Sequence, residues 1–489
     1  MKKRAAILII LLAALLCGCA GSGRAASAAG VSDASPSEAA TAEPTAAPTA
    51  APTAVPTAEP TPTPTAVPTV TAGSLVLDPE TAEADLSGIT EETEAETAIR
   101  ALIEGAPILR SLRAVELGER VPPYELYREL SEAYPEAEIR LSLTLAGESV
   151  GRDAKVLDLH AMDAADTPEL LRVLPYLDGP EEINFVSEET GECVYTLENI
   201  GQLDRVREAA PGVKLRVAFR LFGKRVTSED ERIEYLHKKI GNEGVEKIRS
   251  VLPYLSSCTY FLMDDCGVDN EVMARLREDF PDTKVVWRVW ITKPNYKNKR
   301  ALRRCSFLTD TTRIRTTYIR PKNCGVLKYC TETKYIDFGH NRYMSDFWFL
   351  SYMPKLEVCI LSQTGAADLA PFANCPELEF LEVFTTDIKT LEPLSHCKKL
   401  QYLNIAYCTK LKDITALYEL TNLKVLRMIN TPQVPGTQKR EVAKRLPDCK
   451  ILKGDLDNPT GGGWRKGARY KLLRQQMEYD IDRRVYGIP

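Results

Sequence analysis

The sequence is poor in the residues that most often carry chemistry. Only four of its 489 residues are histidines, and these lie far apart, at His160, His237, His340 and His396. None of them forms an HxH or HExxH pattern, so the histidines predict no zinc or metalloprotease site. Glycine-rich nucleotide-binding loops and the GxSxG nucleophile motif are also absent from the sequence. We therefore expect no metal, no cofactor and no catalytic residue.

The N-terminal apolar run is too short to cross a membrane. Ala5 to Leu16 is 12 residues long, whereas a spanning helix needs about 20. The basic residues 2–4 precede it, and this order is typical of a signal peptide, here residues 1–18. Without those three basic residues, the chain holds 60 Lys and Arg against 68 Asp and Glu, a balance of −8. Such mild acidity gives no reason to expect a nucleic-acid partner.

A candidate lipid-attachment site follows the apolar run, in the order Leu16-Cys17-Gly18-Cys19. A small residue before a cysteine, with leucine three places upstream, resembles the bacterial lipobox. The resemblance implies that Cys19 is lipidated and anchors the chain in the cell membrane, on the extracytoplasmic face. Cys17 is a poorer candidate because the bulky Leu16 precedes it. The alternative is an ordinary secretory signal with an incidental cysteine.

Residues 19–73 join the candidate lipidation site to a low-complexity tether. The core of the tether reads TAEPTAAPTAAPTAVPTAEPTPTPTAVPT. Its frequent prolines block helices and sheet ladders and favour extended polyproline-type structure. At ~3.1 Å per residue, the stretch from 20 to 73 reaches on the order of 170 Å when fully extended. We expect a disordered spacer.

The most regular feature is a repeated leucine pattern near the C-terminal end. The patterns LEVCIL, LEFLEV, LQYLNI and LKVLRM are separated by steps of 22, 22 and 23 residues, starting at Leu356, Leu378, Leu400 and Leu423. The first, fourth and sixth residues of each pattern point inward, and those between point outward, as in a strand. A degenerate copy, KYIDFGHN, precedes them. Units this small bury their apolar faces only by stacking, so residues 333–452 predict a solenoid.

These units resemble leucine-rich repeats of the 22-residue, internalin-like class. Sequences such as IDFGHN, LEFLEVF and LQYLNIAYC are also similar to leucine-rich-repeat surface lipoproteins of Firmicutes-type bacteria. The resemblance covers residues 333–452 and implies a curved α/β solenoid with a parallel sheet on its concave side. It brings neither a reaction nor a ligand, because those families mostly lack an assigned activity.

Two further sets of residues follow the same period. A turn residue that ends each strand is expected to hydrogen-bond the loop backbone, at Asn341, Thr364, Thr386, Cys408 and Thr431. Three cysteines fall in apolar columns, where a free thiol behaves as a small buried hydrophobe, at Cys359, Cys375 and Cys397. Because an extracellular location permits disulfides, Cys258–Cys266 and Cys324–Cys330 remain alternatives.

Residues 74–292 repeat at a longer period. Each copy combines an amphipathic helix, a proline and an alternating strand, so the expected unit is strand, helix, strand, helix, strand. Copies occupy roughly 82–150, 154–226 and 232–292. Alternating strands and helices predict a parallel α/β architecture. We interpret the copies as larger, irregular repeat units that extend the solenoid, and a separate α/β domain is the alternative.

Two basic segments flank the leucine-rich repeats. Residues 293–332 are expected to be a connector, and the stretch from Lys293 to Arg342 holds 13 basic and 3 acidic residues. This charge is either solvated or attracts anionic wall polymers. The tail, residues 453–489, is expected to form a short helix after its glycines. Its apolar side chains are expected to pack on the last repeat as a cap, namely Trp464, Tyr470 and Leu473.

The outward positions of the repeat strands define a predicted binding face on the concave side. Phe380, Phe384 and Tyr402 are expected to form an exposed aromatic cluster, which is typical of interfaces. The alternative is that the tail covers this patch. The predicted face comprises Tyr335, Asp337, His340, Ile360, Phe380, Glu382, Phe384, Tyr402, Asn404, Tyr407 and Arg427.

Together these features predict a lipid-anchored cell-surface protein that recognises a protein or a glycan without catalysis. One alternative is a cell-envelope enzyme, such as a glycan hydrolase, in residues 82–292. A pair of carboxylates converging in a cleft there favours the enzyme. The other alternative is a structural protein that associates with anionic wall polymers.

Overall fold

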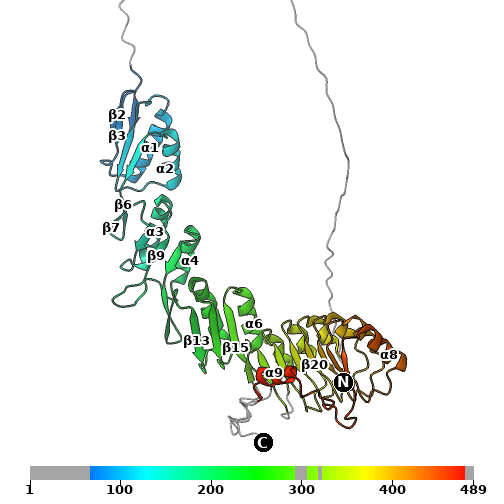
Figure 1. Ribbon diagram of the computed structural model, residues 1–489. Coiled ribbons are helices and arrows are strands. Elements are labelled where there is room, and N and C mark those ends of the chain that lie inside the picture. The colour runs from blue at the N-terminus through cyan, green and yellow to red at the C-terminus, as the bar shows by residue number, and fades with distance from the viewer. Residues whose placement is uncertain (1–66, 292–305, 318–321, 480–489) are drawn as a thin grey trace, which may run out of the picture. The chain divides into compact units, whose positions relative to one another are not determined.

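The computed structural model describes residues 67–291, 306–317 and 322–479 (Figure 1). The predicted signal peptide, Cys19 and the tether up to residue 66 lie outside these ranges, and so do residues 292–305 and 318–321. Within the described residues, no helix combines the length and the apolar character that a membrane crossing requires. The first strand, β1 (Val70–Ala72), lies inside the range expected for the tether and pairs antiparallel with β2 (Leu75–Leu77).

Three units then follow, and in each of them the first three strands pair in parallel in chain order. The first unit holds β3 (Glu83–Asp85), α1 (Glu92–Gly105), β4 (Ala114–Gly118), α2 (Tyr124–Ala133) and β5 (Glu138–Leu141). The second holds β8 (Val156–Asp158), α3 (Thr167–Val173), β9 (Glu182–Asn184), α4 (Ile200–Ala209) and β10 (Lys214–Arg216). The third holds β13 (Arg232–Leu236), α5 (Gly241–Val251), β14 (Tyr260–Asp264), α6 (Asn270–Asp279) and β15 (Lys284–Trp290).

Short antiparallel elements follow each unit. They are the hairpin β6 (Leu143–Leu145) and β7 (Glu148–Val150), the hairpin β11 (Ala218–Leu221) and β12 (Lys224–Thr227), and β16 (Ser306–Leu308) on β15. The helices bury one side at helical spacing, as Val245 and Ile248 do in α5. Strands bury alternate residues, as in β8, where Leu157 is buried between exposed Val156 and Asp158. One contiguous cluster of buried apolar residues extends from Val70 to Cys449, which favours larger repeat units over a separate domain.

The C-terminal repeats form a seven-stranded parallel sheet in strict chain order. Its strands are β17 (Arg313–Arg315), β18 (Tyr335–Asp337), β19 (Val358–Ile360), β20 (Phe380–Glu382), β21 (Tyr402–Asn404), β22 (Val425–Arg427) and β23 (Lys450–Leu452). Between them lie the 3₁₀-helices η4 (Cys324–Tyr329), η5 (Trp348–Tyr352), η6 (Ala370–Asn374), η7 (Glu392–His396) and η8 (Thr415–Glu419), and then α8 (Gly436–Arg445). This is the leucine-rich-repeat solenoid that the spacing predicts.

The sheet begins earlier than the leucine pattern suggests. Residues 313–315 were expected to lie in the basic connector, but they form β17 and pair with β18. Ile314 is fully buried, while Arg313 and Arg315 occupy the outward positions. One apolar residue between two arginines satisfies strand alternation but resembles a charge run in the sequence.

The repeat columns occupy their predicted positions. Cys359, Cys375 and Cys397 are fully buried, and the ten described cysteines are all free thiols, so the two alternative disulfides do not form. Four of the five turn residues bond the backbone, as Asn341 Nδ2 does to the Phe338 carbonyl at 2.9 Å and Thr386 Oγ1 to the Val383 carbonyl at 2.6 Å. The prediction is wrong for Thr431, whose buried hydroxyl has no hydrogen-bond partner among the described residues.

Candidate functional site

Strand register places the predicted binding residues in two rows on one face of the seven-stranded sheet. The first row aligns Tyr335, Val358, Phe380, Tyr402 and Val425. The second row aligns Arg315, Asp337, Ile360, Glu382, Asn404 and Arg427, and we call it the polar row. Each repeat contributes its last outward strand residue to the polar row, so Arg315 lies next to Asp337, and Glu382 lies between Ile360 and Asn404.

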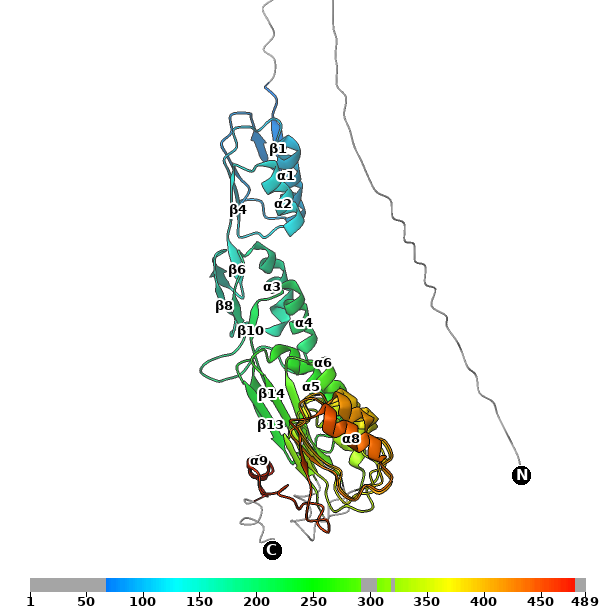
Figure 2. The ribbon, with the colours of Figure 1, turned by 45° about the vertical axis from the view of Figure 1, so that its right-hand side comes forward.

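The face is covered, whereas the sequence pattern predicted an open face. Phe380 is 1% exposed, Phe384 is 2% exposed and Tyr402 is half-buried, so the prediction of an exposed aromatic cluster is wrong. Residues 453–479, which we call the covering segment, lie on this face. Trp464 and Leu473 pack with Phe380 in a cluster separate from the main core. Figure 2 shows α9 (Ala468–Gln476), within this segment, on the side of the sheet opposite α8. The tail therefore packs across several repeats rather than on the last one.

Arg427 holds the beginning of the covering segment. Its guanidinium is fully buried and donates to three main-chain carbonyls, those of Gly454 at 2.9 Å, Asp455 at 2.9 Å and Asn458 at 2.8 Å. On the neighbouring strand, Asn404 Nδ2 donates to the Pro459 carbonyl at 3.0 Å. These contacts bind the peptide backbone and depend little on the side chains of the bound segment.

Trp464 occupies the middle of the face. Its indole N–H donates to Glu382 Oε1, and its ring centroid lies 5.3 Å from that of Phe380. Arg465 lies 3.8 Å from Glu382 Oε2, too far for a hydrogen bond. Burial raises the pKa of the Glu382 carboxyl, and Arg465 opposes that shift. An aromatic donor and a cation thus both face one buried carboxyl.

The end of the covering segment reaches the first strands. The Tyr479 hydroxyl donates to Asp337 Oδ2 at 2.5 Å, and the Arg315 guanidinium lies 4.4 Å from the Tyr479 ring centroid. Arg313 Nε donates to the Gln476 carbonyl at 2.8 Å. Burial raises the pKa of the Asp337 carboxyl. The segment therefore crosses the sheet from β22 back to β17.

Arg469 in α9 adds a cation above the aromatic residues. Its guanidinium carbon lies 5.2 Å from the Phe380 ring centroid and 6.0 Å from that of Tyr402. Desolvation lowers its pKa, while Glu379 and Glu357 act in the opposite direction. A cation over aromatic faces gains from their quadrupoles.

The remaining predicted binding residues lie at the edge of the face. His340 has a left-handed backbone, with φ of 63°, and its Nδ1 lies 2.6 Å from Gln363 Oε1. The Tyr407 hydroxyl donates to the Leu456 carbonyl. Phe384 packs with Ala406 in a small separate cluster. Ile360, in contrast, contacts the covering segment.

Sequence reasoning missed five residues that complete the site. They are Arg313, Arg315, Arg469, Met477 and Tyr479. The tail does carry one visible signal, since a tryptophan stands among basic residues in WRKGARYK. Its position on the concave face follows only from tertiary packing.

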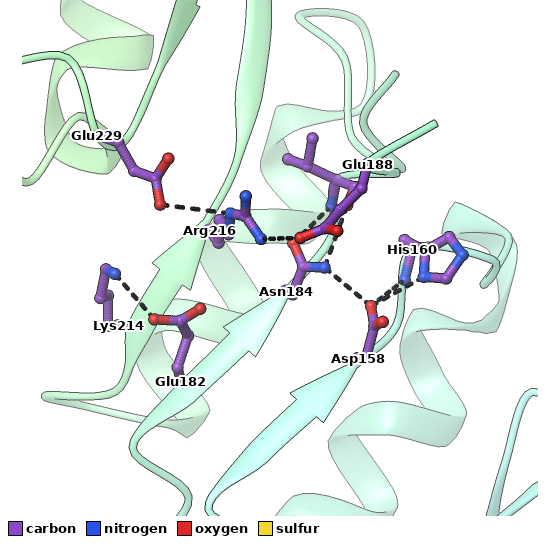
Figure 3. A network of polar contacts seen from close by, with 9 residues as sticks. Asp158, His160, Glu182, Asn184, Glu188, Lys214, Arg216 and Glu229 are labelled. Carbon is purple, nitrogen blue, oxygen red and sulfur yellow. Dashed lines mark hydrogen bonds and ion pairs between the residues drawn. The ribbon is translucent and has the colours of Figure 1, made fainter. Parts of the chain in front are cut away.

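Residues 82–292 carry a charged outward face of their own, shown in Figure 3. Asp158, Asn184 and Arg216 align across β8, β9 and β10. Asp158 Oδ1 accepts from Asn184 at 2.8 Å and lies 2.9 Å from His160 Nδ1, a hydrogen bond that raises the pKa of the His160 imidazole.

The carboxylates of this face are matched by cations. Arg216 contacts Glu188 at 3.3 Å and Glu229 at 3.4 Å, and Lys214 contacts Glu182 at 2.8 Å. Glu188 and Glu229 thus converge on an arginine. No group of metal-ligating side chains occurs among the described residues. The geometry therefore gives the enzyme alternative no specific support.

Comparisons with known proteins assign no activity to this chain. No protein-family model and no curated protein matches the sequence. An internalin from Listeria monocytogenes aligns with 17% identity and a TM-score of 0.25, over 44% of this chain and 67% of that one. Internalin C2 from the same species aligns with 16% identity and a TM-score of 0.20, over 27% of this chain and 69% of that one. A leucine-rich-repeat protein of Leptospira interrogans aligns with 12% identity and a TM-score of 0.23, over 76% of this chain and 96% of that one. The assignment of the solenoid rests on the sheet register and the repeated columns.

Proposed function

We propose that this protein is a lipid-anchored cell-surface protein that recognises a polypeptide partner, without catalysis, through the concave face of its leucine-rich repeats. One observation carries the proposal: the face holds an irregular peptide by its main-chain carbonyls. Arg427, Asn404 and Arg313 all donate to carbonyls of the covering segment. A glycan offers no comparable series of amide carbonyls, so the contacts favour a polypeptide.

The recognition surface is tested by site-specific photo-crosslinking. A photo-reactive amino acid replaces the half-buried Tyr402 of the face. The full-length chain that carries it also carries Trp464→Ala and is displayed on cells. The matched control places it at Trp348, an aromatic residue of η5 that is 43% exposed. We expect an intermolecular adduct from position 402 that a free peptide of residues 453–479 suppresses. Equal adducts from both positions, or none from position 402, contradict recognition through the concave face.

The anchor is supported by the lipobox-like order of residues 16–19 and by the tether that follows. Two acyl chains hold a protein stably at a membrane, whereas one chain does not. Metabolic labelling with an alkyne fatty acid tests it. We expect Cys19→Ala to abolish labelling and membrane association, and Cys17→Ala to retain both. Unchanged labelling of Cys19→Ala contradicts the anchor.

A further inference from the structure

The covering segment satisfies the concave face incompletely. Glu382 Oε2, Arg427 Nε and Arg469 Nη2 are buried without a hydrogen-bond partner among the described residues. Buried polar atoms are normally paired, so each of these exceptions needs an explanation. Two of the three belong to the polar row itself. The face therefore offers hydrogen-bonding capacity that its present occupant leaves unused.

The covering segment also has little structure that is independent of the sheet. Residues 453–458 are exposed, and the three glycines that follow include two with positive φ, Gly462 and Gly463. Helix α9 has nine residues, which is too short for a stable isolated helix in water. The segment therefore becomes ordered by docking, and undocking releases conformational entropy.

Charge complementarity indicates what the face prefers. The covering segment brings Arg465 and Arg469 to a surface that carries Glu382, Glu379 and Glu357. The indole donor and the cation meet at the same buried carboxyl. The face thus selects an aromatic side chain flanked by basic residues, after a stretch of free main-chain carbonyls.

We propose that the covering segment competes with the partner for the concave face. The partner presents a basic polypeptide segment that bears a tryptophan, and this segment displaces residues 453–479 from the face. This inference rests on the proposed function and specifies its partner. A guanidinium or ammonium group that reaches Glu382 Oε2 makes the hydrogen bond that Arg465 does not make. Because the competitor is covalently linked, its effective concentration is high, and the apparent affinity for the partner is reduced by the fraction of molecules whose face is open.

The test uses a fluorescein-labelled peptide of residues 453–479 as the probe and the full-length chain as its receptor. Trp464→Ala in the chain weakens the internal competitor, so we expect the probe to bind this variant at least about ten-fold more tightly than the wild type. Adding Glu382→Leu to that variant removes the acceptor of the probe's indole N–H and is expected to remove the gain. The matched control Trp348→Ala, on the opposite side of the sheet, binds the probe like the wild type.

A second variant guards against misfolding. Tyr479→Phe removes only the hydroxyl that donates to Asp337, and it is expected to raise probe affinity less than Trp464→Ala. Unchanged probe binding in both variants overturns the inference, whether or not Trp464→Ala alters the circular dichroism spectrum. A probe carrying Arg465→Gln and Arg469→Gln is expected to bind more weakly, and equal binding contradicts the basic preference.

The two proposals fail separately. If the probe shows no gain in affinity but cells yield an adduct from position 402 alone, recognition through the face is supported and displacement of the covering segment is contradicted. If the probe gains affinity but no adduct forms, the segment is displaceable and recognition of a cellular partner falls.

Discussion

The hydrogen bond between Trp464 and Glu382 gives the sharpest energetic prediction. Trp464→Phe keeps an aromatic ring near Phe380 but removes the only hydrogen-bond donor to the Glu382 carboxyl among the described residues. Glu382 is 0% exposed, so its carboxyl then lies buried without any hydrogen bond. Hydrogen bonds to charged groups contribute about 1.5–3 kcal/mol, and we expect docking of the covering segment to weaken by about 2–3 kcal/mol.

The complementary change tests whether this loss belongs to the pair. Glu382→Leu places an apolar side chain beside Ile360 but leaves the Trp464 N–H buried without an acceptor, a loss of about 1–3 kcal/mol. In the double variant neither unpaired group remains. We therefore expect the double variant to lose about 1–2 kcal/mol less than the sum of the single losses.

Native-state hydrogen exchange of the α9 amides measures the docking free energy. An isolated helix of this length is unstable, so these amides exchange when the segment leaves the face. A loss of 2–3 kcal/mol corresponds to exchange that is about 30- to 150-fold faster, since about 1.4 kcal/mol is a factor of ten. Trp348→Phe is the control and leaves α9 unchanged. Additivity of the two single variants within about 0.5 kcal/mol refutes the pairing.

Three further predictions use the same regions. Gly462 has a φ of +63°, and an added Cβ meets the Arg427 guanidinium. Gly462→Ala is therefore expected to weaken docking of the covering segment by about 1–2 kcal/mol or more and so to speed exchange of the α9 amides. Exchange like the wild type contradicts the packing. Burial raises the pKa of Glu382, so its contribution to docking is present below the ordinary carboxyl pKa of about 4 and is lost as pH rises through the raised value. After correction for intrinsic rates, α9 protection is expected to fall as pH rises above the ordinary carboxyl pKa of about 4 and to do so less in Glu382→Gln; a rise contradicts this sign. Burial raises the pKa of the Cys330 thiol to about 12, so a maleimide at pH 8 is expected to label it only in denaturant, and labelling of the native chain at the denatured rate contradicts its burial.

The sequence predicts the architecture of the repeats because the information is local and periodic. A step of 22 or 23 residues with strand alternation fixes which side chains of β18 to β22 face inward. Register then follows, since a slip of one residue turns Leu381 or Leu403 out of the core. The same logic identifies Cys375 and Cys397 as core residues.

The covering of the face could not be predicted in the same way. Trp464, Leu473 and Met477 are spaced by nine and four residues and give no clear amphipathic period. Much of their binding site lies far earlier in the chain, as Phe380 and Glu382 do, 84 and 82 positions before Trp464. β17 escaped recognition because Arg313 and Arg315 resemble a solvated charge run. Long-range docking of a charged segment leaves almost no local pattern.

The composition of the polar row argues for a face with two states. Asp337 and Asn404 each accept from the backbone N–H two residues later, so local turn structure explains them. The Glu382 carboxyl has no such local bond among the described residues, and the Arg427 side chain donates only to carbonyls at the end of β23 or beyond it, within the described residues.

On a permanently covered face, apolar residues of similar size are often as stabilising as buried ionic groups or more so. Charges at these two positions are easily solvated when the segment leaves, and they bind carbonyls and an indole when it returns. Apolar side chains there would expose a large hydrophobic patch in the open state, which favours aggregation. The buried charges of Glu382 and Arg427 are therefore better explained by reversible covering than by permanent packing.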